Sequence, residues 1–347
     1  MIPALDRLPG VRRGARLTAI GLLAVLIMPA QTQPSAWRLD GANVIMAPEH
    51  AFGSMSARRS LADLRALGAG AIAIVPFLWQ RSPQSPDIVR GDDMPDAVLR
   101  AAIRDAHALG FAVVVKPHVW VPASWAGAIA IESEDGWRRW FAGYRDELVG
   151  IARLAAQEQA EALAIGTELV LASQRPEWRD LIAAARAVYS GRLLYVAHNL
   201  DEAETVPFWD ALDAIGASLY PPLGADDDLT ARRAAMKAAA ERLDLLAART
   251  GKPVVVAEIG LRSARGAAAK PWESAEERAS APDPALQAAV LADWLAALDR
   301  PRIRGVLIWR WLTDPQAGGV SDTDFTVQGK PAQHVLTCAW TNACGPP

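Results

Sequence analysis

Two glutamates come at the ends of apolar runs that resemble buried strands, which makes them the first candidates for chemistry. Glu168 follows the apolar start of "LAIGTELVLAS", and Glu258 lies in "PVVVAEIG". A buried carboxylate is costly unless it has a partner or a function. Two carboxylates can together cleave a glycosidic bond, because one attacks the anomeric carbon while the other donates a proton to the leaving oxygen. Glu168 and Glu258 are therefore the candidate catalytic residues; separate ion pairs with basic side chains are the alternative.

Other polar and aromatic side chains also come at the ends of apolar runs. An indole face can cover the apolar face of a sugar ring, and the chain has 13 tryptophans. Strand alternation leads us to expect that only one of Trp309 and Trp311 points inward. Lys116, His198 and Arg310 lie at strand ends without an assigned role. The candidates for contact with a substrate are Trp79, His118, Trp120, Asn199, Tyr220, Trp309 and Trp311.

The elements that must position these side chains alternate between apolar and amphipathic runs. The amphipathic runs predict helices; the first covers residues 56–68, with Ser56 as its expected N-cap. Eight strands alternating with helices predict an α/β fold, a (β/α)8 TIM barrel. A doubly wound sheet is the rival, but the chain has no GxGxxG motif and no P-loop. The predicted strands, continuous apolar runs buried on both faces, are residues 42–48, 71–79, 112–120, 162–169, 192–199, 214–222, 253–260 and 304–311.

The carboxyl ends of the strands form the active face of such a barrel. Glu168 and Glu258 end the fourth and seventh strands, so they face each other across the mouth. A barrel radius of roughly 7 to 8 Å leaves roughly 6 Å between their carboxyl groups. That value is nearer the ~5 to 5.5 Å of a retaining glycosidase than the wide end of the inverting range. Asp314, Asp322 and Asp324 are expected to be solvated loop carboxylates, with contacts to substrate hydroxyls as the alternative.

The bulk composition and the termini set the class of protein. The chain is 51% hydrophobic with a net charge of -3, which is typical of a globular protein and gives no reason to expect a nucleic-acid partner. Residues 1–35, with four arginines before a 12-residue apolar run, predict a signal peptide and export to the periplasm or the cell exterior. A retained membrane anchor is the alternative, although the run is short for a span.

Residues 36–347 are predicted to form a single catalytic domain with a C-terminal tail. Within it, residues 262–284 are expected to be a lid or a mobile insertion. Cys338 and Cys344 are expected to pair if the protein is exported. No cluster has the spacing of metal ligands, so the sequence predicts neither a metal nor a cofactor, and nothing in it indicates an oligomeric state.

Three motifs, in this order and at these strand positions, resemble a known group of enzymes. They are "KPHVW" (116–120), "IGTEL" (165–169) and "VAEIG" (256–260). The pattern is similar to the retaining glycoside hydrolases of clan A, and most similar to glycoside hydrolase family 113, a family of β-mannanases, over about residues 40 to 335. The resemblance implies that Glu168 is the acid/base and Glu258 the nucleophile. It also implies double displacement on a β-linked, mannan-like polysaccharide or oligosaccharide, without a cofactor.

The resemblance further implies roles for residues around the two glutamates. Tyr220 would orient Glu258, His118 would lie beside the reacting sugar, and Trp309 or Trp311 would form a platform under it. Thr167 departs from the clan pattern, in which many members have an asparagine that binds the sugar 2-hydroxyl, so the choice of sugar is open. The alternatives are a β-glycan hydrolase of gluco- or mixed specificity and a non-catalytic carbohydrate-binding barrel, which the presence of both carboxylates disfavours.

Overall fold

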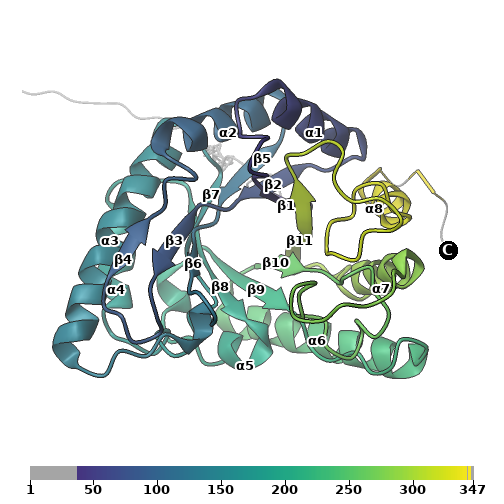
Figure 1. Ribbon diagram of the computed structural model, residues 1–347. Helices are drawn as coiled ribbons and strands as arrows, with labels where there is room; N and C mark the ends of the chain where they lie inside the picture. The colour runs from purple at the N-terminus through teal and green to yellow at the C-terminus, as the bar shows by residue number, and fades with distance from the viewer. Residues whose placement is uncertain (1–36, 342, 345–347) are drawn as a thin grey trace, which may run out of the picture. The chain divides into compact units, whose positions relative to one another are not determined.

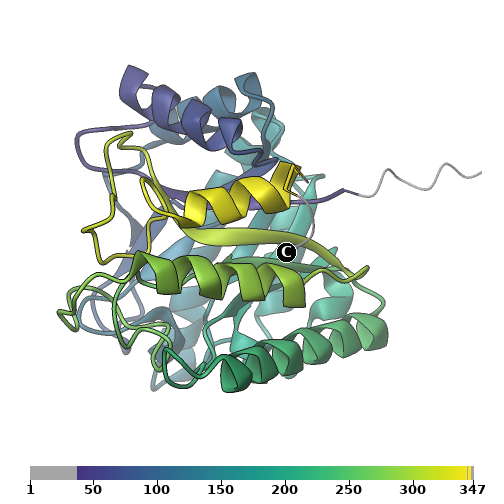
Figure 2. The same cartoon turned by 90° about the vertical axis from the view of Figure 1, so that its right-hand side faces the viewer.

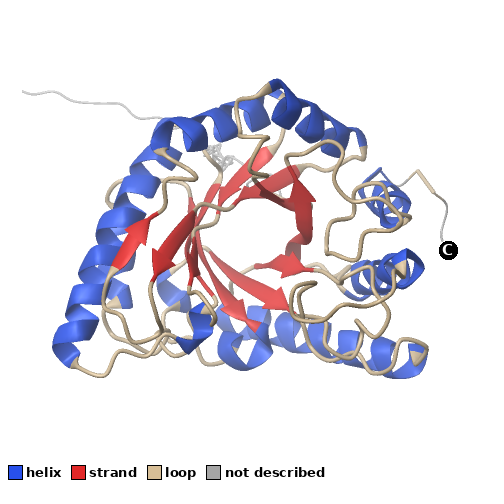
Figure 3. Ribbon diagram, in the orientation of Figure 1, coloured by secondary structure: helices blue, strands red, loops and turns tan. Residues whose placement is uncertain are grey.

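A closed barrel of eight parallel strands forms the centre of the protein. The computed structural model describes residues 37–341, 343 and 344, so the predicted signal segment lies outside the described residues. The strands follow the order β1-β11-β10-β9-β8-β7-β5-β2, and helices surround them (Figure 1, Figure 3), which confirms the predicted (β/α)8 barrel. The barrel strands are β1 (Gly41–Ile45), β2 (Ala71–Ile74), β5 (Ala112–Val115), β7 (Ala162–Thr167), β8 (Arg192–His198), β9 (Ala214–Leu219), β10 (Val254–Ile259) and β11 (Ile303–Leu312).

Both faces of these strands are buried, which explains why the apolar runs are continuous rather than alternating. Small side chains such as Ala73 and Ala164 fill the barrel interior, while larger ones such as Ile72 and Ile165 pack outward against the helices. The barrel closes tightly at Gly41, where an added Cβ would lie 1.7 Å from the carbonyl oxygen of Ala71. The sequence pattern therefore encodes a double-sided core.

The helices agree with the predicted amphipathic runs, with three differences. Ser54 rather than Ser56 caps α1, since its hydroxyl accepts the Ala57 N–H at 3.2 Å. A short α5 follows β8 directly, and α8 forms in the predicted tail. Figure 2 shows α8 (yellow) and α7 (green) side by side outside the last barrel strands. The helices are α1 (Met55–Ala66), α2 (Asp96–Ala108), α3 (Glu134–Gln157), α4 (Trp178–Arg186), α5 (Asn199–Ala203), α6 (Leu229–Thr250), α7 (Pro284–Ala297) and α8 (Ala332–Thr341).

The second and third predicted strands are wrong in length, because each breaks at a proline. Pro76 and Pro117 have no N–H to donate to a barrel ladder. Beyond them, β3 (Phe77–Gln80) and β6 (His118–Trp120) leave the barrel and pair with each other, and β4 (Ile88–Arg90) adds to β3. This three-stranded accessory sheet lies beside the barrel in Figure 1. The second halves of the two predicted strands therefore belong to this sheet and not to the barrel.

The remaining predictions on segments have mixed outcomes. Residues 262–284 are folded by their own contacts, such as Arg265 N–H to the Ala281 carbonyl at 3.0 Å, and their role as a lid stays a prediction. Cys338 and Cys344 form a disulfide, as expected. Among the described residues, none of the helices has the length and apolar character that a membrane span requires.

Candidate active site

The side chain of Glu258, on β10, is held by two donors from neighbouring parts of the barrel. The Lys116 ammonium donates to its Oε2 at 2.6 Å, and the Tyr220 hydroxyl donates to its Oε1 at 2.8 Å. Lys116 is fully buried and Glu258 is 8% exposed. A buried carboxylate with a cation on one oxygen and a hydroxyl on the other is held in one orientation by charge-assisted hydrogen bonds. Such a carboxylate can act as a nucleophile.

Tyr220 follows β9 and donates to Glu258, as the family resemblance implied. Burial, together with the negative charge of Glu258, raises the pKa of Tyr220 well above its ordinary value. The phenol therefore keeps its proton over the physiological range and acts only as a donor toward the carboxylate. The Lys116 ammonium also lies 5.3 Å from the ring centroid of Trp309, so one cation contacts both the carboxylate and the indole.

Glu168 comes directly after β7, and its side chain is held at one oxygen only. Its Oε1 accepts from His198 Nδ1 at 2.9 Å and from the Ser218 hydroxyl. Burial raises the pKa of Glu168, but the hydrogen bonds and charge of His198 and the bond from Ser218 outweigh it and lower the pKa to about 2. No such bond holds Oε2 among the described residues. The free oxygen is the one available to a substrate.

The backbone at Glu168 is unusual, and hydrogen bonds through Tyr195 and Glu202 hold it in place. Glu168 has φ 56 and Asn199 has φ 52, a region that costs a non-glycine residue free energy and clusters at functional sites. The Leu169 N–H donates to the Tyr195 hydroxyl at 2.9 Å, and that hydroxyl donates to Glu202 Oε1 at 2.6 Å. The other oxygen of Glu202 accepts the His198 N–H at 2.6 Å. These hydrogen bonds fix the positions of Glu168 and His198 relative to each other.

His118 is the first residue of β6, in the accessory sheet, and is within electrostatic reach of both glutamates. Burial lowers its pKa, against the opposing charges of Glu168 and Glu258. Its ring meets Phe77 edge to face at 6.0 Å between centroids, and Phe77 meets Trp120 in the same way at 6.0 Å. Trp120 in turn lies 6.3 Å from Trp79. These rings form a continuous row from His118 outward.

The outer end of this row is open to solvent. Trp79 is 39% exposed and Trp120 is 49% exposed. Beside Trp79 is a shallow hollow of about 390 Å³, lined also by Val89 and Asp92. Exposed tryptophans beside a catalytic centre are suited to stack against sugar rings.

The structure separates the two tryptophans of β11. Trp309 lies at the site, over Lys116, whereas Trp311 is 1% exposed and donates its indole N–H to Ser60 of α1 at 2.8 Å. Trp311 is therefore a core residue, and its prediction as a substrate contact is wrong. The expectation that only one of the two points to the site is confirmed, but strand alternation is not the reason, since residues two apart share a face in a regular strand. A register irregularity in the β1–β11 pairing, at Trp309 and Arg310, separates the two side chains.

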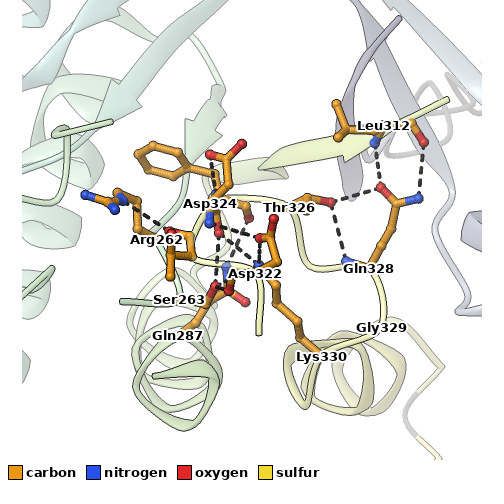
Figure 4. A network of polar contacts seen from close by, with 12 residues as sticks. Arg262, Ser263, Gln287, Leu312, Asp322, Asp324, Thr326, Gln328, Gly329 and Lys330 are labelled. Carbon is orange, nitrogen blue, oxygen red and sulfur yellow. Dashed lines mark hydrogen bonds and ion pairs between the residues drawn. The ribbon is translucent and has the colours of Figure 1, made fainter. Parts of the chain in front are cut away.

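The loop after β11 is held by a buried polar network, shown in Figure 4. The Lys330 ammonium donates to Asp322 Oδ1 at 2.6 Å, to Ser263 Oγ at 2.7 Å and to the Asp324 carbonyl at 2.9 Å. The carboxylate of Asp324 pairs with Arg310. Asp322 and Asp324 are therefore structural partners of cations, which corrects the expectation that they are solvated; Asp314 lies 3.5 Å from His50.

Two further positions bear on the predicted site. Thr167 is 1% exposed, and its hydroxyl donates to the Pro117 carbonyl at 3.0 Å, so it does not replace the 2-hydroxyl contact of an asparagine. Asn199 was predicted to contact substrate. In the structure its side chain is hydrogen-bonded to the His198 ring and to the backbone N–H of Tyr220.

The sequence predictions gave no role to Lys116 and His198, although both were noted at strand ends, and they missed Ser218 and Trp125. Trp125 covers the His198 ring at 4.8 Å between centroids. For Lys116, His198 and Ser218 the available signal was a polar side chain near a strand end, whereas Trp125 lies in the loop after β6 and gave none. Among the described residues, His334 and the disulfide-bonded Cys338 and Cys344 form the one cluster with metal-ligand spacing, and a disulfide sulfur is a poor ligand.

Comparisons with known proteins agree with this geometry. The family model of Glycoside Hydrolase Family 113 matches residues 43–330. The GH113 β-mannanase of Alicyclobacillus acidocaldarius, solved with ManMIm, is 25% identical with a TM-score of 0.78, covering 89% of this chain and 98% of that one. A GH113 β-1,4-mannanase complex is 25% identical with a TM-score of 0.77, covering 88% and 99%.

Other comparisons show a similar fold or no match. A Ruminococcus gnavus β-glucuronidase is 14% identical with a TM-score of 0.60, covering 88% of this chain and 50% of that one, and shares the fold alone. No curated protein sequence gave a significant match. The family match spans most of the chain and includes both strand-end glutamates. The chain belongs to glycoside hydrolase family 113 and is a retaining β-glycoside hydrolase.

Proposed function

We propose that this enzyme hydrolyses β-linked mannan chains, with Glu258 as nucleophile and Glu168 as acid/base. The observation that carries the proposal is the asymmetry between the two carboxylates. Both oxygens of Glu258 have donors, including the buried Lys116, which suits a fixed anion. Glu168 is held at one oxygen and leaves the other free, which suits proton transfer. The similarity to two structures described as β-mannanases supports the choice of sugar.

The first half of the reaction uses both groups at once. Glu258 attacks the anomeric carbon, and its C–O bond forms as the bond to the leaving oxygen breaks. Glu168 gives that oxygen its proton, so the leaving sugar departs as a neutral alcohol. Tyr220 keeps its proton and holds Glu258 in line during the attack.

The second half reverses the roles. Glu168, now a carboxylate, takes a proton from water, and the water oxygen attacks the glycosyl–Glu258 ester. The bond to Glu258 breaks and the carboxylate returns to Lys116 and Tyr220. Two inversions leave the product with the anomeric configuration of the substrate.

The aromatic residues supply the binding surface in this proposal. Trp309 is the platform beside the cleavage point, because it lies next to Lys116 and thus next to Glu258. His118, at the start of β6, lines the site at the inner end of the accessory sheet. Trp79 and Trp120 bind sugar units farther along the chain.

A gluco- or mixed-specificity β-glycan hydrolase is the second candidate, because Thr167 provides no selection for mannose. In mannose the 2-hydroxyl is axial, and the hydroxyl of Thr167 is already used on Pro117. Discrimination between mannose and glucose must then come from other residues. Hydrolysis rates on matched β-1,4-linked manno- and gluco-oligosaccharides decide between the two candidates.

The catalytic assignment is tested with Glu258→Ala and Glu168→Ala on an activated aryl β-mannoside. We expect each to lose kcat by at least about a thousandfold. Azide should restore Glu258→Ala with formation of the α-mannosyl azide, and Glu168→Ala with formation of the β-mannosyl azide. Glu241→Ala, on the outer helix α6, is the control and should keep wild-type rates. The opposite azide anomers, or full activity of either variant, would refute the assignment.

We also propose that the protein is exported. The basic start, the 12-residue apolar run and the small polar residues after it support this. Expression of the full chain followed by cell fractionation and N-terminal sequencing should find a shortened protein in the periplasm or medium. Recovery of the uncleaved chain in the membrane fraction would favour the alternative, an anchor.

A further inference from the structure

His198 lies between the candidate acid/base and a second polar side chain. Its Nδ1 is 2.9 Å from Glu168 Oε1, and its Nε2 is 2.9 Å from Asn199 Nδ2. Both ring nitrogens therefore have a fixed partner. Which nitrogen carries hydrogen decides what His198 can offer to Glu168.

The orientation of the Asn199 amide settles this question. Asn199 Oδ1 accepts the backbone N–H of Tyr220 at 2.8 Å, so the amide oxygen is committed and the NH2 group faces His198. An NH2 group can only donate. His198 Nε2 must then be a bare acceptor, and the ring hydrogen must be on Nδ1, pointing at Glu168. This is a neutral imidazole in one tautomer.

The charged groups around the ring, in contrast, favour a second proton on it, which would make it an imidazolium. Burial lowers the pKa of His198, but the hydrogen bond and charge of Glu168 outweigh burial and raise it, with smaller contributions from Glu202 on α5 and Glu258 on β10. The pair can therefore hold the same number of protons in two ways. In the first, His198 is an imidazolium and Glu168 a carboxylate; in the second, His198 is neutral and Glu168 is a carboxylic acid.

Only the second arrangement can protonate a leaving group. In the first arrangement, an imidazolium N–H at Nε2 would point at the N–H of Asn199, which is repulsive. The amide therefore works against the imidazolium and in favour of a neutral ring.

We propose that Asn199 is a positioning residue that keeps His198 neutral in its Nδ1–H form, so that the ring orients Glu168 without holding a second proton of its own. Asn199 selects the Nδ1–H form of His198, which donates to Oε1 of Glu168 and leaves Oε2 as the oxygen that carries the proton. During leaving-group departure the proton moves from Oε2 to the glycosidic oxygen, and His198 keeps its own. This inference rests on the proposed role of Glu168 as the acid.

The ring state can be measured directly by ¹⁵N NMR of histidine-labelled protein at pH 7, with His198→Gln to assign the signals. We expect a protonated Nδ1 and an unprotonated Nε2 in the wild type. In Asn199→Asp, the carboxylate can still accept from Tyr220, but it now accepts from Nε2–H as well. We expect both ring nitrogens to be protonated in that variant. A doubly protonated ring in the wild type would overturn the proposal.

Kinetics on two leaving groups give the second readout. Asn199→Asp and His198→Ala should lower kcat/KM about ten- to a hundredfold on an unactivated manno-oligosaccharide, which needs the acid. Both should stay near wild type in kcat/KM on a dinitrophenyl β-mannoside, whose leaving group needs no proton. Equal losses on both substrates would show a merely structural role and overturn the proposal. A wild type without activity on either mannoside would refute the proposed function instead, and the NMR result would still stand.

Discussion

At the scale of single residues, the least expected feature is the buried Lys116. A buried ammonium is costly unless it is paired with good geometry. The 2.6 Å contact of its ammonium with Glu258 supplies that pairing. The same ammonium also lies over the ring of Trp309, the proposed sugar platform. Lys116 therefore connects the nucleophile to the platform that we propose for the substrate.

We predict that Lys116→Met lowers kcat by at least about a hundredfold, since it removes a preorganised charge-assisted donor from the nucleophile. Circular dichroism should show an unchanged fold, because methionine fills much of the same volume. Lys237→Met, at an exposed position of α6, is the matched control. Wild-type turnover in Lys116→Met would contradict the role given to this residue.

At the scale of elements, the accessory sheet of β4, β3 and β6 gives the barrel its outer binding surface. The pairing of β3 with β6 places Trp79 opposite Trp120, so their rings lie together on one side of the sheet. The row continues inward through Phe77 to His118. Two proline breaks thus convert parts of two buried runs into an exposed aromatic track that begins at the active site.

The track leads to a prediction that depends on substrate length. Trp120→Ala should raise KM for long manno-oligosaccharides about tenfold, since an aromatic contact contributes up to about 1.5 kcal/mol. KM for a short aryl mannoside should not change, because that substrate does not reach the outer track. Trp37→Ala is the control, since Trp37 precedes β1 at the opposite end of the barrel, where it packs on Arg192. An equal rise in KM for both substrates would argue against an outer binding site.

At the scale of the whole molecule, the segments after β10 and β11 are joined by the network around Lys330. The side chain of Lys330 is fully buried, and burial lowers its pKa against the attraction of Asp322. Through Asp324, the same network reaches Arg310 at the end of β11. The C-terminal part of the described chain therefore supports the strand that carries Trp309.

We predict that Lys330→Met lowers the free energy of unfolding by about 2 kcal/mol, from lost hydrogen bonds to charged partners. Denaturant unfolding followed by fluorescence measures this change. Lys270→Met, at an exposed position in the segment after β10, should leave the midpoint where it is. An unchanged midpoint for Lys330→Met would mean that the network contributes little to stability.

The sequence by itself determined the fold class and the two central acids. Continuous apolar runs report strands buried on both faces, and eight of them alternating with helices report a closed barrel. Glu168 and Glu258 were visible because a carboxylate at the end of a buried run is rare without a partner or a function. These signals are local, so they survive without knowledge of the tertiary structure.

Only the tertiary structure decided which side chains meet. Lys116 and Glu258 are 142 positions apart, and Ser60 and Trp311 are 251 apart, so neither contact leaves a trace in local periodicity. The same holds for His198, whose tautomer depends on an amide oriented by the backbone of Tyr220. The physical reason is that closure of the barrel and the register of its strands bring these groups together. Hydrophobic patterning specifies burial, whereas hydrogen-bond partners and ion pairs depend on distances that exist only in the folded chain.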